Sequence, residues 1–177
     1  MADCDSLDGG IDTGCENNLG GSRKIWLLEK ARVTAVGLSS PLGDISSLTI
    51  SGSPAANFFL FEGGKNTSGY VENLTSSQED GRDLYEQTIT LVLNRREKTK
   101  RDQLLLIARR KDLVALVEDN NGIVWYLGEV NGLNLITNAG GSGVKKDDPN
   151  QYVITLMGQE SNPANTVTAS CYTTSTT

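Results

Sequence analysis

The chain has 177 residues, a formal net charge of −6 and no histidine. Its length suits one domain with a core of its own, and its acidic balance argues against attraction to the phosphates of nucleic acids. Without histidine there is no Ser/His or Cys/His pair and the commonest general base near neutral pH is missing. We therefore expect no enzymatic activity.

The N-terminal residues 1–22 contain five acids and few apolar side chains, so we expect an arm or tail without a core of its own. A single β-rich domain is expected over 23–160, and a second, small and polar arm or tail over 161–177. Short alternating apolar runs, punctuated by Gly and Pro, are typical of strands. Strands are predicted at 25–28, 33–36, 45–50, 85–93, 128–136 and 152–158.

A hairpin is predicted where 57–62 and 69–74 flank the polar tip 63–68. A long exposed loop is predicted over 138–150, which is rich in Gly, Lys, Asp and Asn. Trp26 is the expected core anchor near the start of the domain.

One α-helix is predicted at about 99–110. Thr99 and Asp102 offer the chemistry of a capping box ahead of apolar positions with i, i+3, i+4 spacing. Two apolar runs, 113–117 and 123–127, follow the helix and are joined by an acidic, Asn-rich turn that ends in Gly. This pattern predicts a second hairpin.

The remaining motifs are weak. Asp8, Asp12 and Glu16 lack the alternate spacing of a calcium loop, and the glycine-rich stretch 140–143 is not followed by the Lys-Ser or Lys-Thr of a P-loop. We therefore expect no metal site and no cofactor. The three cysteines form no CxxC pair, which favours a reducing compartment. No apolar run reaches the roughly 20 residues that cross a bilayer, and the acidic start does not resemble a secretory signal.

Positive charge is concentrated in 95–111, which has eight basic and two acidic residues and so carries +6, while the rest of the chain carries −12. A solvated helix face would explain this window. The alternative is a head-to-tail contact with an acidic surface of an identical subunit, a type of contact that closes into rings. The candidate interface residues are Arg95, Arg96, Lys98, Lys100 and Arg101, together with Lys65, Asn66 and Thr67 of the predicted hairpin tip.

Four stretches carry a resemblance to known proteins: NNLGGSRKIWL (17–27), LYEQTITL (84–91), VEDNNG with a following YLG (117–128), and YVITLMGQE (152–160). They resemble a family of small virion proteins from tailed bacteriophages of Bacteroidales, including the crAss-like group. The resemblance implies a tail-tube-like fold, a mainly β sandwich or partly closed barrel with one flanking helix, repeated as a ring. The family supplies no active-site residues.

The leading hypothesis is therefore a phage virion structural protein that forms a homo-oligomeric ring in the tail or the head-to-tail neck. Its expected place is the virion, assembled in the host cytoplasm. The expected partners are identical subunits and adjacent tail, neck or portal proteins; the genome passes through without sequence-specific binding, and no membrane is involved. The alternative is a monomeric β-sandwich that binds a carbohydrate or a cell-surface ligand.

Overall fold

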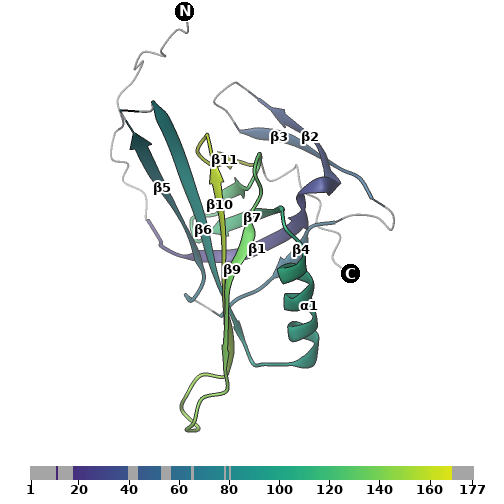
Figure 1. Ribbon diagram of the computed structural model, residues 1–177, viewed down its shortest axis with the longest axis vertical. Helices are drawn as coiled ribbons and strands as arrows, with labels where there is room; N and C mark the ends of the chain where they lie inside the picture. The colour runs from purple at the N-terminus through teal and green to yellow at the C-terminus, as the bar shows by residue number, and fades with distance from the viewer. Residues whose placement is uncertain are drawn as a thin grey trace, which may run out of the picture.

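The computed structural model describes residues 11, 18–39, 44–52, 57–64, 66–77, 79 and 81–168. These residues form eleven strands, one α-helix and one 3-10 turn (Figure 1). In chain order the elements are β1 (Ser22–Glu29), η1 (Lys30–Arg32), β2 (Val33–Leu38), β3 (Ile45–Ile50), β4 (Phe59–Phe61), β5 (Gly69–Ser77), β6 (Arg82–Asn94), α1 (Lys98–Arg109), β7 (Leu113–Asp119), β8 (Val124–Leu127), β9 (Asn134–Gly141), β10 (Gln151–Glu160) and β11 (Asn165–Thr166).

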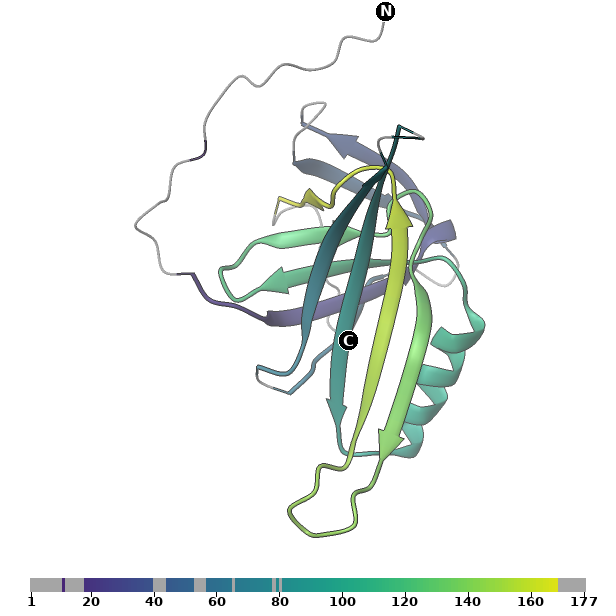
Figure 2. The same ribbon diagram turned by 60° about the vertical axis from the view of Figure 1, so that its left-hand side comes forward.

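The strands form three antiparallel sheets. A five-stranded sheet has the order β11-β8-β7-β1-β4, a four-stranded sheet has the order β5-β6-β10-β9, and β2 pairs with β3. The four-stranded sheet runs along the long axis and the five-stranded sheet crosses it (Figures 1 and 2). The prediction of a mainly β fold with one flanking helix is confirmed, and no sheet of the described residues closes into a barrel.

A first apolar core lies between the four-stranded and five-stranded sheets. The inward residues of β6 and β10, such as Ile89, Leu91 and Ile154, are fully buried there. Helix α1 adds Leu104 and Ile107 to the same cluster. Since burying one such side chain contributes about 1.5–3 kcal/mol, this core fixes the helix against the sheets.

A second core covers the opposite face of the five-stranded sheet. Trp26, Leu116 and Tyr126 from β1, β7 and β8 pack there with Ile45 of β3 and with Val167. The five-stranded sheet is therefore buried on both faces. This explains why β7 begins with five consecutive buried residues instead of alternating between apolar and polar side chains.

Two buried polar side chains tie the turn before β9 to the four-stranded sheet. The side-chain oxygen of Gln87 accepts a hydrogen bond from the amide of Gly128 at 3.0 Å. The buried carboxylate of Glu160 accepts hydrogen bonds from the amides of Val130 and Asn131 at 2.8–3.2 Å. These bonds satisfy backbone groups that would otherwise be costly to bury.

The helix prediction is confirmed to within one residue at each end, but the predicted capping box is wrong. The N-cap is Glu97, which makes no side-chain capping bond, and its carbonyl accepts the first helical hydrogen bond from Arg101 at 3.0 Å. Thr99 and Asp102 lie inside the helix. The carboxylate of Asp102 pairs with Lys98 at 3.7 Å instead of capping an amide.

The predicted hairpin between 57–62 and 69–74 is wrong. β4 pairs with β1, whereas β5 pairs with β6, so the residues between them cross from one sheet to the other. The apolar β4 extends the edge of the buried five-stranded sheet. This pairing stabilises the fold more than a local hairpin with a six-residue polar tip would. The second predicted hairpin is confirmed as β7 and β8, with the carboxylate of Asp119 accepting hydrogen bonds from the amides of Asn121 and Ile123 at 2.9 Å.

The predicted strand at 128–136 begins too early. Gly128 and Gly132 have φ angles of +76° and +78°, so the chain turns there before β9 starts at Asn134. β9 then continues to Gly141, and the predicted loop at 138–150 is wrong for its first four residues. Pairing with β10 extends the strand through the glycines, although their intrinsic strand preference is low.

The chain beyond β10 contributes to the fold as far as Thr168. β11 pairs with β8, the amide of Val167 donates to the carbonyl of Val124 at 2.8 Å, and the side chain of Val167 is buried. The domain boundaries proposed at 22 and 160 remain predictions. No α-helix in the described part of the chain is long and apolar enough to cross a membrane.

Candidate functional site

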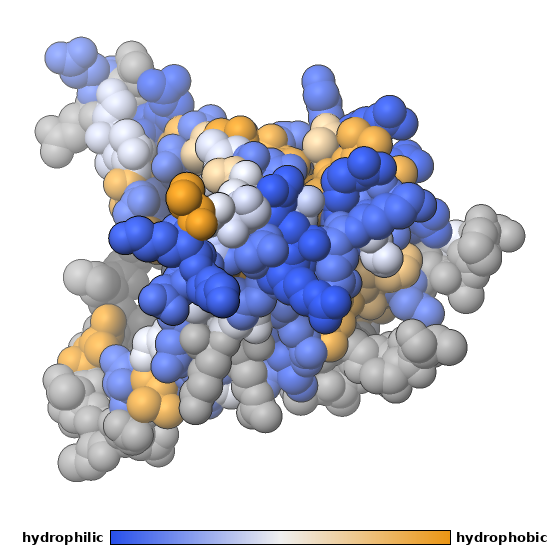
Figure 3. All heavy atoms as spheres, turned by 90° about the horizontal axis from the view of Figure 1, so that it is seen from below, coloured by the Kyte–Doolittle hydropathy of each residue, from blue (hydrophilic) through white to orange (hydrophobic). Residues whose placement is uncertain are grey.

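The basic residues predicted as an interface lie around the loop between β6 and α1, at the lower end of the molecule in Figure 1. Seen from below, much of this end is covered by hydrophilic side chains (Figure 3). Arg95 is largely exposed and pairs with Glu97 at 2.9 Å, while Lys98 and Arg101 both pair with Asp102. Exposed pairs contribute only about 0–1 kcal/mol, so they leave these cations able to bind a partner.

Two members of the predicted set make contacts within the domain. The ammonium group of Lys100 donates hydrogen bonds to the carbonyls of Asn94 and Arg95, which closes the end of β6. The guanidinium of Arg96 lies 5.1 Å from the centre of the Tyr152 ring, a cation–π contact at the start of β10. Lys100 therefore has a structural role that the sequence pattern did not indicate.

The second predicted set lies beside the same end of β6. Thr67 donates its hydroxyl to the carbonyl of Gly64 at 2.6 Å, and Asn66 has a φ of 59°, so this segment forms a compact turn. The amide of Gly64 donates to the carbonyl of Val92 in β6 at 3.1 Å. Asn66 and Thr67 thus flank one side of β6. Lys65 lies outside the described residues.

The four-stranded sheet has two long open edges, which sequence reasoning missed. No strand among the described residues pairs with the outer side of β5 or of β9. β5 has nine residues with Glu72 as its one charge, and β9 has eight residues with no charge. A β-bulge at the start of β9 leaves the run 137–141 in regular register with β10.

Sheet edges in monomeric proteins are usually protected by Lys, Pro, bulges or short strands, because unpaired backbone groups invite another chain. The bulge, the contact of α1 with β9 and the hydrogen bond from the amide of Asp112 to the side chain of Asn134 are the protection that β9 has, and in the described part of the chain β5 has none of these features. The sequence does show that 69–77 and 134–141 contain no Lys, Arg or Pro. This lack of protecting residues points to an open edge only once the strand order shows that these two strands are the edges of the sheet.

The outer face of the four-stranded sheet carries few charges. Between Leu84 and Val92 of β6, Glu86 is the only charged residue, and it lies between Asn73 of β5 and Gln159 of β10. Arg82 lies on the same face at the start of β6, where it pairs with Ser77 of β5. The other residues on this face are uncharged and include Val71, Thr75, Leu84, Thr88, Thr90, Val92, Asn134, Thr137, Ala139, Val153, Thr155 and Met157.

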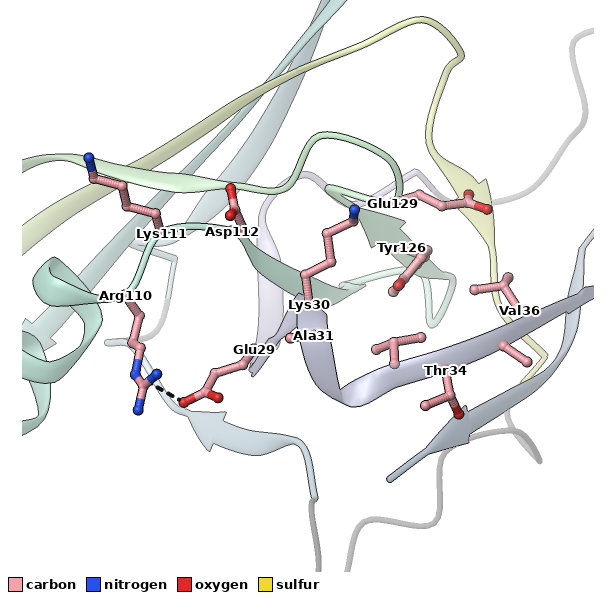
Figure 4. A pocket seen from close by; sticks show the side chains of 12 residues that line it. Glu29, Lys30, Ala31, Thr34, Val36, Arg110, Lys111, Asp112, Tyr126 and Glu129 are labelled. Atoms are coloured by element: carbon pink, nitrogen blue, oxygen red, sulfur yellow. Dashed lines mark ion pairs between the residues drawn. The ribbon is translucent and has the colours of Figure 1, made fainter. Parts of the chain in front are cut away.

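A broad cleft of about 550 Å³ lies between η1, β2, Tyr126 of β8 and the residues 110–112 that link α1 to β7 (Figure 4). Glu29 and Arg110 form an ion pair at 3.2 Å on its wall, and Lys30 and Glu129 add charges of both signs. Burial, with the nearby carboxylates of Glu129 and Glu160, raises the pKa of the Tyr126 hydroxyl, so this phenol remains protonated. The cleft offers a polar surface of mixed charge.

A second cleft, of about 430 Å³, lies between β8, β11 and the end of β10. Trp125 lines it together with Glu129, Glu160 and Asn165. The indole of Trp125 donates to the carboxylate of Asp119 at 3.4 Å, and its ring lies 5.9 Å from the ring of Tyr70. An aromatic side chain beside polar groups is what the alternative hypothesis of a carbohydrate-binding module requires.

Within the ranges that the structure describes, no group of three or more Cys, Asp or Glu side chains is placed to hold a metal ion. Comparison of the chain with models of known protein families gives no match. Comparisons with curated proteins and with solved structures also give none.

Proposed function

We propose that this chain is a structural protein that assembles head to tail through the two open edges of its four-stranded sheet and forms a homo-oligomeric ring. The observation that carries the proposal is the pair of long, almost uncharged edge strands, β5 and β9. Unpaired edges of this length favour the addition of a strand from another chain. The two edges are similar in length, so each can serve as the partner of the other.

The strand directions support a head-to-tail contact. Neighbouring strands alternate in direction across the order β5-β6-β10-β9, so the two edge strands run opposite to each other. When two copies stand side by side in the same orientation, β9 of one meets β5 of the next in antiparallel register. This contact uses both edges of every copy and closes into a ring when the rotation between copies allows it.

Pairing of two β5 edges about a two-fold axis would instead make a dimer and leave both β9 edges open. Such a dimer would retain the open edge that strand addition removes. The head-to-tail arrangement satisfies both edges at once.

The predicted interface residues fit this arrangement. Arg95 and Arg96 lie next to the end of β9, since Arg96 contacts Tyr152 and the amide of Arg95 donates to the carbonyl of Asn150 at 2.7 Å. The turn with Asn66 and Thr67 lies on the β5 side of β6. In a joined sheet the basic residues of one copy approach this turn of the next copy, where the nearby Glu62 supplies a carboxylate.

We also propose that the ring belongs to the tail or neck of a tailed phage, where it stacks with adjacent tail, neck or portal proteins and lines the path of the genome. The four stretches that resemble small phage virion proteins support this part of the proposal. The near-absence of basic residues on the outer sheet face is compatible with it, because such a face does not hold phosphates.

Mass photometry and negative-stain microscopy of the purified full chain test the assembly. We expect closed particles with masses that are multiples of 19.0 kDa. A chain that stays monomeric at all concentrations, or that stops at a dimer, contradicts the proposal. A monomer that binds on a glycan array would favour the carbohydrate-binding alternative and its cleft around Trp125. Detection of the chain in purified phage particles tests the virion role separately.

A further inference from the structure

A groove of about 240 Å³ lies between α1 and β4, on the side of the molecule away from β5. Its walls are mainly apolar, with Phe59 and Phe61 of β4 facing Leu106 and Ile107 of α1. Phe59 is 65% exposed and Leu106 is 51% exposed. Two large apolar side chains that face solvent across one groove indicate a surface that binds another chain.

The rim of the groove is basic. Arg32 and Arg110 both line it and both pair with the carboxylate of Glu29, at 3.2 Å each. Two guanidinium groups therefore share one acid, and Arg109 and Lys111 flank Arg110 in the sequence. A ligand with apolar and acidic side chains would suit both the walls and the rim.

The first 17 residues of this chain have that composition. They contain Asp3, Asp5, Asp8, Asp12 and Glu16 and no basic residue. Leu7 and Ile11 are the aliphatic side chains larger than alanine in this segment, and Ile11 is fully exposed. This composition gives too little apolar surface for a core of its own, and it matches a surface with apolar walls and a basic rim.

The segment joins the domain on the side opposite the groove. The amide of Leu19 donates to the side chain of Asn121 at 2.8 Å, in the turn between β7 and β8. Figures 1 and 2 both show the start of β1 on the left and α1 on the right. In a head-to-tail assembly the left side of one copy meets the right side of the next. Seventeen extended residues span up to about 56 Å, which is enough to reach across that contact.

We propose that residues 1–17 of one copy bind the groove between α1 and β4 of the adjacent copy. The apolar side chains Leu7 and Ile11 pack against Phe59 and Leu106, and neighbouring carboxylates bind Arg110. This inference rests on the proposed head-to-tail assembly. It adds a second contact between adjacent copies, made by residues 1–17. It also gives the concentrated basic charge around α1 an acidic partner supplied by the same chain.

A photo-crosslinking amino acid at position 106 of the full chain tests this contact. Copies that carry the crosslinker are mixed with isotope-labelled copies before illumination, so that mass spectrometry separates crosslinks between copies from those within one copy. We expect crosslinks from position 106 to residues 1–17 of the other copy. The matched control places the same crosslinker at Leu105, which is 48% exposed but does not line the groove.

The charges of the segment are tested with a pair of double variants. Asp8→Asn with Asp12→Asn removes two carboxylates, and we expect it to lower the crosslink yield about five- to tenfold. Ser6→Asn with Thr13→Asn introduces the same residues without changing the charge and should leave the yield unchanged. Equal yields from the two double variants would contradict the charge complementarity on which the inference depends.

The outcomes separate this inference from the proposed ring. Rings that form while position 106 gives no more crosslinks to 1–17 than position 105 overturn the inference and leave the ring intact. Crosslinks found only within one copy also overturn it, because the segment would then bind its own groove. A chain that never assembles overturns both proposals.

Discussion

The two large sheets differ in how far their faces are buried and in how long their edge strands are. The five-stranded sheet is buried on both faces and ends in short edge strands, β4 with three residues and β11 with two. The four-stranded sheet is buried on one face and ends in strands of nine and eight residues with almost no charge. Both sheets contribute to the first core, so the difference lies in the edges: under the proposed assembly, the long edges of the four-stranded sheet are the ones left for another copy.

The largest predicted effect tests where stability resides. Leu116 lies in β7 with 0% exposure, and Leu116→Ala should lower the free energy of unfolding by about 2–5 kcal/mol, because it removes packing from a buried site. Leu74 lies in the edge strand β5 and is 55% exposed. Leu74→Ala should change the free energy by no more than about 0.5 kcal/mol. Urea unfolding followed by circular dichroism measures both, and similar losses would contradict the burial of Leu116 and the exposure of Leu74 in the structure.

The next effect concerns two glycines at the ends of β8, both in the left-handed region. A Cβ on Gly128 would lie 2.8 Å from the carbonyl oxygen of Leu113 and 2.9 Å from Leu133, whereas a Cβ on Gly122 would meet nothing within 4 Å. We expect Gly128→Ala to destabilise the fold by more than about 2 kcal/mol, through strain and a backbone clash. Gly122→Ala should cost only the strain of a positive φ, about 1 kcal/mol.

The same unfolding measurement applies to the two glycine variants. If Gly122→Ala lowers the free energy of unfolding as much as Gly128→Ala does, the predicted clash of a Cβ at position 128 with Leu113 and Leu133 does not add to the destabilisation. If neither variant is destabilised, the turn before β9 is not held as the structure shows.

The smallest effect lies at the tip of the hairpin between β9 and β10, away from both cores. The carboxylate of Asp148 accepts hydrogen bonds from the amides of Val144 and Lys145 at 2.7 and 2.8 Å, and these bonds lower its pKa below the usual 3.8. A lowered pKa in the folded state means that the bonds stabilise the tip above the unfolded pKa and are lost as pH falls through the folded value.

We therefore expect the amide NMR shifts of Val144 and Lys145 to titrate together with a midpoint below 3.8, while the core amides stay unchanged. Asp148→Asn should abolish that titration without altering assembly. A midpoint at or above the usual value would show that the two hydrogen bonds do not hold the tip in solution.

Local patterns predicted much of this fold. The β7–β8 hairpin and α1 were placed correctly, because turn residues and the spacing of apolar side chains act over a few positions. The predicted partner of β4, the strand at 69–74, was wrong, because Phe59 and Phe61 pair with β1 more than thirty residues away. The turn at Gly128 was also missed, since Leu113 and Leu133 crowd it from distant parts of the sequence.

The candidate interface was predicted only in part. The cations around α1 are visible as a charge run, but the contacts of Lys100 with Asn94 and of Arg96 with Tyr152 depend on how β6 ends and on where β10 lies. The open edges could not be identified from sequence, because an edge is defined by the order of strands that are distant along the chain.

The central claim is that β9 of one copy pairs with β5 of the next, and variants that block one edge each test it most directly. Along an edge strand, successive amides point alternately to the neighbouring strand and to the open side. Proline is therefore placed in turn at the adjacent positions Asn138 and Ala139 of β9, and at Asn73 and Leu74 of β5, which avoids Glu72 because its carboxylate accepts hydrogen bonds from Gln87 and Ala164. In each pair, the proline that removes an amide pointing to the neighbouring strand destabilises the fold. The more stable variant therefore keeps the hydrogen bonds within the sheet and removes an amide from the open edge. Alanine at the selected position, or wild type at Ala139, is the matched control.

Native mass spectrometry of each blocked variant alone and of their equimolar mixture is the decisive measurement. Because every pairing of two sheets needs one free β9 and one free β5 edge, and the proposed contact of residues 1–17 rests on that pairing, each variant alone should be monomeric. The mixture should form a dimer with one copy of each variant, while the alanine controls assemble as the wild-type chain does. Dimers of the β9-blocked variant alone, or full assembly of either variant, would contradict head-to-tail pairing of these two edges.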